Sequence, residues 1–395
     1  MTDGPGDREQ PPPGWSPTQP PAYGAPGPWA APHDQGSYPP PPPPPPGGGY
    51  YPPPGHHYGA PVLKPGIIPL RPLQLGDLYN GAVAVIRANP KATLGLSALV
   101  VTVAEIITLA IQLPAFGAFV GAATLNEQAL AENPELIIGP MLSFLGSTML
   151  GLVVTSVAMV VLTGMLTGIV GRAVFGEKIS IGTAWNLVKG RVVPLIGLAL
   201  LQVLIVFGIF LVPLALLLFL IAGGLPTGPS VLLGLFLIVG GVCLAVFFYT
   251  KLSMASSAIV LEGIGVGAAM SRSFRLVKGD FWRVFGILLL TSVVVGLVAA
   301  AVSAPFSLFG SVGDPATALD TTQFYIAAIL GGVGAIIAGT ITNPFTAAVT
   351  TLLYADRRMR AEAFDLVLQT EAVERQQGAP GAGHDNLWRP RNPWS

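Results

Sequence analysis

The chain has 395 residues, of which 51% are hydrophobic and only 10% are Asp, Glu, Lys or Arg. Soluble domains carry about 25% charged residues, so this composition excludes a protein with an ordinary water-facing surface. Twenty Lys and Arg balance twenty Asp and Glu, which argues against nucleic acid as a partner.

Residues 1–69 form the first predicted segment, a tail rich in Pro and Gly. It contains an unbroken run of prolines at 39–46, and proline lacks the backbone donor that regular helices and sheets use. Its aliphatic side chains are too few for a core. We therefore expect a disordered cytoplasmic tail with polyproline II character, suited to recruiting protein partners. Residues 1–58 also lack the apolar stretch of a signal peptide.

Six apolar stretches follow, at residues 92–113, 138–170, 192–222, 230–250, 284–304 and 324–353. Each is long enough to cross a bilayer as a helix, which needs about 20 residues. Residues 192–250 contain no Asp, Glu, Lys or Arg and are broken at Gly223 and Gly224, which predicts a tight hairpin. We therefore expect an all-α polytopic membrane protein with six transmembrane helices over residues 70–368. A second disordered cytoplasmic tail is expected at residues 369–395.

The charged residues between these stretches divide into two groups. With the N-terminus inside, the inner loops carry all the Lys and Arg near helix ends, whereas the outer loops carry only acids such as Glu127, Glu135 and Asp314. Cytoplasmic loops accumulate basic residues. This sorting predicts a multi-pass protein of the cell (plasma) membrane with both termini in the cytoplasm.

An internal repeat precedes the odd-numbered stretches. Gly76 is followed by Arg87 after 11 positions and by a second glycine after 19, and Gly267 is followed by Lys278 and another glycine at the same spacings. A copy at Gly182 matches if four residues, about one helical turn, are removed. Apolar residues at helical spacing accompany each copy. We expect three units, each an interfacial helix followed by a transmembrane hairpin, and ordinary loops with accidental similarity are the alternative.

Basic residues flank these expected interfacial helices. They suit contact with anionic lipid head groups at the inner leaflet, and a role restricted to fixing the topology is the alternative. The head-group candidates are Arg87, Lys91, Lys189, Arg191, Arg272, Arg275, Lys278 and Arg283.

Three segments carry a resemblance to a known family: residues 71–78 (RPLQLGDL), 87–91 (RANPK) and 352–360 (LLYADRRMR). Residues 70–368 resemble the membrane domain of glycerophosphoryl diester phosphodiesterases, which in bacteria occurs fused to a soluble phosphodiesterase domain or alone behind a Pro/Gly-rich tail. The resemblance implies a membrane part that stands alone. A phosphodiesterase would need catalytic histidines and metal-binding carboxylates on a soluble barrel, and this chain has no such stretch.

Polar residues inside the expected spans are candidates for a site. Glu105 lies deep in the first span, where an acid indicates a proton or cation site, and a hydrogen-bonded packing residue is the alternative. The sixth span carries Thr342, Asn343 and Thr346 beside Pro344. These side chains suit a polar path across the membrane, with helix-to-helix adhesion as the alternative.

Three functions remain open on these residues. The first is a non-catalytic, lipid-interacting scaffold or regulator, and the second is a transporter or lipid flippase that uses Glu105 and the sixth span. The third is a lipid enzyme, which the sequence disfavours because no histidine lies between Gly59 and Gly383 to act as a general base. We expect no metal and no cofactor.

Overall fold

A computed structural model of the chain describes residues 66–123, 125, 132–133, 135–224, 226–310, 321–376 and 387–388. Within these residues the regular structure is helical, with no strand. In chain order the helices are α1 (Leu75–Ala88), α2 (Pro90–Ala123), α4 (Glu135–Ala173), α5 (Ile181–Val188), the 3₁₀ turn η1 (Lys189–Arg191), α6 (Val192–Ala222), α7 (Thr227–Leu252), α8 (Ala255–Glu262), α9 (Val266–Lys278), α10 (Phe281–Gly310), α11 (Thr321–Glu362) and α12 (Phe364–Gln376). Of the disordered tail expected over residues 1–69, residues 1–65 lie outside the described part.

Six of these helices, α2, α4, α6, α7, α10 and α11, are long and apolar enough to cross a membrane. Each contains one of the predicted stretches, so the six-helix prediction is confirmed. α4 alone has 39 residues, or about 58 Å of helix, which exceeds the roughly 30 Å of a bilayer's hydrocarbon. Large apolar side chains such as Leu232 and Phe236 are 70% and 73% exposed, as lipid contact requires.

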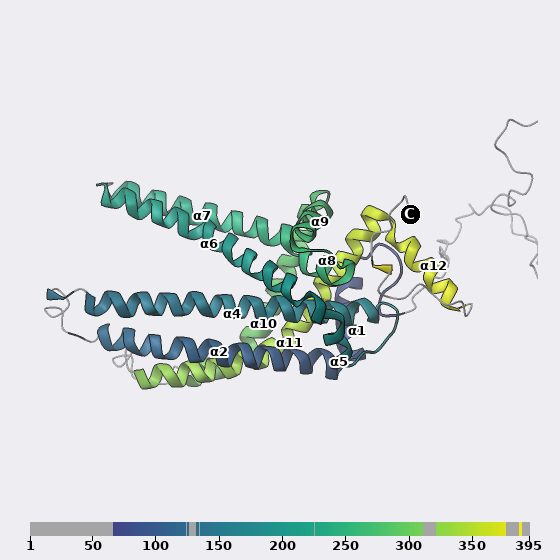
Figure 1. Ribbon diagram of the computed structural model, residues 1–395, viewed down its shortest axis with the longest axis horizontal. Coiled ribbons are helices and arrows are strands. Elements are labelled where there is room, and N and C mark those ends of the chain that lie inside the picture. The colour runs from purple at the N-terminus through teal and green to yellow at the C-terminus, as the bar shows by residue number, and fades with distance from the viewer. Residues whose placement is uncertain are drawn as a thin grey trace, which may run out of the picture. The chain divides into compact units, whose positions relative to one another are not determined.

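The shorter helices gather at one end of the spanning helices (Figure 1). We call this end the charged end, because every Lys and Arg from residue 66 to residue 376 lies in the short helices, in the connections beside them or in the adjoining ends of the spanning helices. Fully buried apolar side chains gather here too, among them Tyr354, Leu78 and Leu195. The charged end therefore holds the protein's core.

The internal repeat reappears in the helix boundaries. Gly76, Gly182 and Gly267 are each the second residue of a short helix, namely α1, α5 and α9. The next spanning helix has a glycine five positions after its first residue in all three copies. The next spanning helix begins 14 positions after Gly76 and Gly267 but 10 positions after Gly182, which agrees with the four-residue deletion. Each short helix leads into a transmembrane hairpin, as expected.

The apolar faces of the short helices pack inward. Leu78, Ala82 and Val85 on α1 are buried in the core of the charged end. Gly81 on the same face lies so close to Ile68 and Leu352 that a Cβ there would come within 2.8 Å of both side chains. These faces therefore pack against the spanning helices and are not exposed.

One helix at this end was not expected from the sequence. α8 follows α7 after a short turn, and all eight of its residues are buried. It ends at Gly263, whose φ of 77° is the left-handed conformation that favours glycine at a helix C-terminus. Its mixture of Ser, Ala and aliphatic residues has little amphipathic pattern, so sequence alone treats it as part of a connection.

Both expected domain boundaries require correction. Ile68 is fully buried, so the packed domain begins before residue 70. α12 continues to Gln376 because Phe364, Leu368 and Ala372 form a buried stripe along it. Leu387 and Trp388 are also buried, at 4% exposure each. The disorder expected from residue 369 is therefore wrong for these segments, and the rest of that tail lies outside the described residues.

Candidate functional site

A groove lies between α4, α6, α7 and α11. Two adjoining cavities, of about 290 Å³ and about 270 Å³, make it up. They share the lining residues Met159, Val160, Gln202 and Val206. In Figure 1 the α6–α7 hairpin leans away from α2 and α4 toward the ends opposite the charged end. The groove is thus formed where this hairpin separates from the other spanning helices.

Helical spacing aligns the walls of the groove. Gln202, Val206 and Ile209 follow one face of α6, and Ala245 and Leu252 lie seven positions apart on one face of α7. No Asp, Glu, Lys, Arg or His lines either cavity. The polar lining side chains are Ser156, Thr163, Gln202, Tyr249, Ser253, Ser256, Thr346 and Thr350. The groove is therefore apolar with neutral hydrogen-bonding groups.

The polar groups of the groove differ in their partners. Thr346 Oγ1 donates to the carbonyl of Thr342 at 3.1 Å, and Thr350 Oγ1 donates to the carbonyl of Thr346 at 2.8 Å. Within the described residues, the side chains of Thr163 and Gln202 make no hydrogen bond to the protein. An amide or hydroxyl without a partner in apolar surroundings costs about 1–3 kcal/mol. A bound polar atom would therefore stabilise Thr163 and Gln202.

A layer of buried ion pairs closes the charged end. Glu262, at the end of α8, forms an ion pair of 2.9 Å with Arg272 and accepts a hydrogen bond from the hydroxyl of Tyr354. Arg272 also pairs with Glu362 at the end of α11, and Arg358 lies 3.8 Å from Glu262. Burial lowers the pKa of Arg272, but the two carboxylates outweigh it and the net shift is upward. These ion pairs join α8, α9 and α11 to one another.

A second part of this layer surrounds Asp356. Its side chain is fully buried, and it pairs with Arg360 at 2.9 Å and Arg283 at 3.3 Å. It also accepts the backbone N–H of Leu73 at 2.8 Å, while both arginines donate to the carbonyl of Leu73. Beside it, Arg357 pairs with Asp280. The carboxylate therefore ties the segment before α1 to α10 and α11.

The predicted head-group residues separate into two sets. Arg87, Lys91, Lys189, Arg275 and Lys278 are exposed at the charged end. Arg272 and Arg283 belong to the ion-pair layer, and Arg191 donates to the carbonyls of Ile259 and Val260 in the last turn of α8. Sequence alone cannot separate the sets, because a paired and an exposed arginine look alike. The structure leaves five of the eight on the surface.

Sequence reasoning missed Lys251, which is 9% exposed at the end of α7. Its ammonium lies 5.7–5.9 Å from the ring centroids of Phe247, Phe274 and Phe281, which come from α7, α9 and α10. Aromatic faces attract cations at this range. Lys251 therefore links three helices through these contacts. The aromatic residues around position 281 were the only sequence feature that could have indicated them.

The four intramembrane candidates do not form one site. Only Thr346 lines the groove. Thr342 is buried and donates to the carbonyl of Ala338, and Asn343 lies against Gly339 on its own helix. Glu105 lies between α2 and α11, where its Oε1 would be 3.2 Å from a Cβ at Gly332. Gly332 is about 21 Å along α11 from Thr346.

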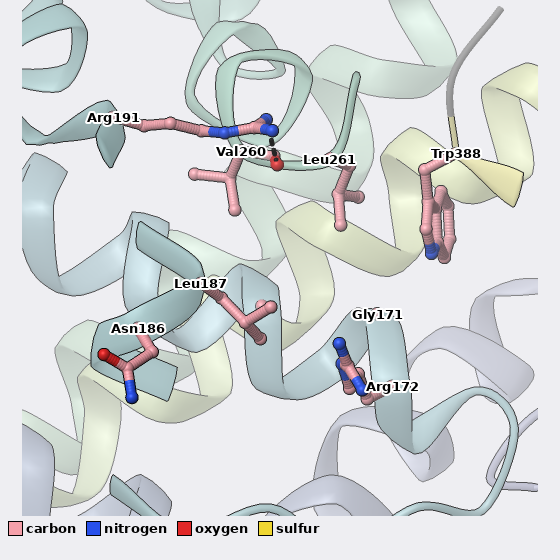
Figure 2. A pocket seen from close by; sticks show the side chains of 9 residues that line it. Gly171, Arg172, Asn186, Leu187, Arg191, Val260, Leu261 and Trp388 are labelled. Carbon is pink, nitrogen blue, oxygen red and sulfur yellow. Dashed lines mark hydrogen bonds between the residues drawn. The ribbon is translucent and has the colours of Figure 1, made fainter. Parts of the chain in front are cut away.

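A smaller cavity of about 160 Å³ lies at the charged end, lined in part by Arg172, Arg191 and Trp388 (Figure 2). Figure 2 shows Arg191 reaching the backbone oxygen of Val260. Arg172 forms an ion pair of 3.5 Å with Glu177. Both guanidinium groups thus already interact with the protein, which makes this cavity a weaker candidate than the groove.

A family model described as a domain of unknown function, DUF7847, matches residues 80–356. The chain belongs to this family. Neither the curated proteins nor the solved structures provide a match. The DUF7847 region runs from the first turns of α1 to Asp356. It therefore contains all the residues that line the groove and the carboxylates Glu262 and Asp356, and it excludes α12.

Proposed function

We propose that this protein is a non-catalytic membrane protein that binds lipid in the groove between α4, α6, α7 and α11 and acts as a scaffold or regulator. The groove is the observation that carries the proposal. It lies within the spanning segments, its walls are uncharged, and its two cavities share four lining residues. An acyl chain has the shape and polarity that such a groove accommodates.

The charged end adds a second contact with lipid. Arg87, Lys91, Lys189, Arg275 and Lys278 are exposed where the spanning helices meet the short helices. In our proposal this end faces the cytoplasm of the plasma membrane, because basic residues concentrate on that side, and both termini are cytoplasmic. The exposed side chains then contact anionic lipid of the inner leaflet, and the Pro-rich tail that precedes the packed domain recruits protein partners.

The non-catalytic part of the proposal rests on residue types. All four histidines, His33, His56, His57 and His384, lie outside the described residues. The described part contains no group of three or more His, Cys, Asp or Glu placed to hold a metal ion. The buried carboxylates Glu262 and Asp356 at the charged end are engaged in ion pairs. The resemblance of residues 70–368 to the membrane domain of glycerophosphoryl diester phosphodiesterases agrees with a stand-alone membrane part.

A transporter or flippase is the second candidate, and the position of Thr346 and Thr350 in the groove favours it. Transport would require the α6–α7 hairpin to move against α4. Glu105 would then act as a separate proton site, because it contacts Gly332 and not the groove. Lipid binding without transport needs fewer steps from the same observations.

The lipid proposal is tested by filling the groove. Val206→Trp places an indole at the junction of the two cavities. Leu204→Trp on the same helix is the control, because Leu204 is 66% exposed and lines neither cavity. Native mass spectrometry of the delipidated proteins should show retained lipid on wild type and on Leu204→Trp, and markedly less on Val206→Trp. Equal retention by all three proteins would overturn the proposal.

A further inference from the structure

Two polar groups of the groove lie at the same distance from the charged end. Thr163 lies ten residues before the end of α4 at Ala173, and Gln202 lies ten residues after the start of α6 at Val192. Ten residues of helix rise about 15 Å. Both positions therefore lie about 15 Å inward from the charged-end termini of their helices, within the apolar spanning segments. Thr346, on α11, lines the same cavity of about 290 Å³.

Gln202 is the polar residue common to both cavities of the groove. It lines both cavities, and its amide offers two donors and an acceptor. No hydrogen bond to the described protein satisfies that amide. Thr163 lines the same cavity, and its hydroxyl also has no partner in the described part. The hydroxyl of Thr346 donates a hydrogen bond to the carbonyl oxygen of Thr342, and its oxygen can still accept one.

The uncharged lining of the groove selects among lipids. The phosphate of an ordinary phospholipid would meet no Lys or Arg in either cavity, and a charged group within the spanning helices is costly without a counter-charge. An uncharged lipid whose hydroxyl or carbonyl oxygen reaches the level of Gln202 and Thr163 can bond both the amide and the hydroxyl.

We infer that the groove selects an uncharged lipid with a hydroxyl or carbonyl oxygen, such as a diacylglycerol or a long-chain alcohol, and that Gln202 is the residue that sets this selectivity. The inference rests on the proposed lipid-binding function. Thr163 and Thr346 assist by bonding the same polar group, and the apolar residues of the second cavity accommodate the chain.

The test uses the full-length protein in phosphatidylcholine nanodiscs. Two photoreactive probes carry the same diazirine-bearing acyl chain, one on diacylglycerol and one on phosphatidylcholine. Cross-linking to the peptides that contain Met159 and Val206 is measured by mass spectrometry. Wild type should be labelled saturably by the diacylglycerol probe. Unlabelled diacylglycerol and a polyprenyl alcohol are tested separately as competitors, which separates the two sources of the hydroxyl group, and phosphatidylglycerol should not compete.

The decisive variant is Gln202→Leu, with Gln112→Leu as its control. Gln112 is also an amide within a spanning helix, but it lies on α2 against Gly151, outside the groove. Loss of the hydrogen bonds should lower labelling by the diacylglycerol probe roughly three- to tenfold in Gln202→Leu and leave phosphatidylcholine labelling unchanged. Gln112→Leu should match wild type.

The outcomes separate this inference from the proposed function. Equal diacylglycerol labelling of wild type and Gln202→Leu, with saturable labelling of the groove, would overturn the selectivity and leave lipid binding intact. Stronger labelling of wild type by the phosphatidylcholine probe than by the diacylglycerol probe would also overturn the selectivity and leave lipid binding intact. Absence of saturable labelling by either probe at Met159 and Val206 would remove the lipid-binding function itself.

Discussion

The carboxylate of Asp356 accepts a hydrogen bond from the backbone N–H of Leu73 at 2.8 Å, joining residues that are 283 positions apart. Arg283 and Arg360 complete the arrangement, because each bonds both to the carboxylate and to the carbonyl of Leu73. The entry to α1 and the end of α11 are thereby fixed to each other, which closes the bundle at the charged end.

Removing this carboxylate should destabilise the protein strongly. Asp356→Ala leaves two arginines beside a buried site without their counter-charge, which costs about 3–5 kcal/mol in comparable pairs. Glu374→Gln, at an exposed position of α12, is the control and should change the free energy of unfolding by less than about 0.5 kcal/mol. Unfolding of both variants in mixed detergent provides the measurement. An unchanged midpoint for Asp356→Ala would show that the ion pairs of Asp356 do not stabilise the protein.

The buried C-terminal tryptophan should also contribute to stability. Trp388 is 4% exposed, packs on Phe364 with ring centroids 5.2 Å apart, and accepts a hydrogen bond from Arg358 through its carbonyl. Trp388→Ala should cost about 3–5 kcal/mol, as large-to-small changes in cores do. Trp282→Ala is the matched control, since Trp282 is 78% exposed. Equal melting temperatures for Trp388→Ala and Trp282→Ala would contradict a stabilising role for the contacts of Trp388.

Glu105 is the residue on which the transporter alternative depends. Glu105→Gln keeps the shape and hydrogen-bonding capacity of the side chain and removes its titratable proton. Because Glu105 contacts Gly332 and does not line the groove, this variant should retain bound lipid like wild type. Loss of pH-dependent uptake in reconstituted vesicles, with normal folding, would support proton-coupled transport. Wild-type behaviour in uptake assays would make Glu105 a packing residue.

The orientation of the charged end can be tested by labelling. In a Cys243→Ala background, a cysteine at Gly224 should react with an impermeant maleimide in intact cells, because the α6–α7 turn faces outward in the proposal. A cysteine at Gly279, beside α10, should react only after the membrane is permeabilised. Labelling of position 279 in intact cells would reverse the proposed topology.

The parts of the fold that were predictable depend on one-dimensional patterns. Apolar length identifies the six spans, and the spacing of Gly76, Gly182 and Gly267 locates the short helices before them. α8 was missed because its eight residues are buried on every side and so show no amphipathic period. The membrane domain was expected to end too early, at residue 368, because the buried stripe of α12, from Phe364 to Ala372, is interrupted by charged and polar residues.

The candidate site was less accessible to sequence reasoning. The partners of Arg272 and Arg283 come from helices far away in the chain, so their burial could not be inferred from neighbouring residues. The groove depends on the angle at which the α6–α7 hairpin leaves α4, which no local pattern encodes. Gln202 was visible as a polar residue in an apolar run, but only the two cavities give it significance.

A density map of the protein in native-lipid nanodiscs, obtained by electron cryomicroscopy, tests lipid binding in the groove most directly. We expect elongated density that passes Met159 and Val206 between α4 and α6 and has its polar end within hydrogen-bond distance of the Gln202 amide. An α6–α7 hairpin packed against α4 along its whole length, with protein side chains filling both cavities, would contradict it.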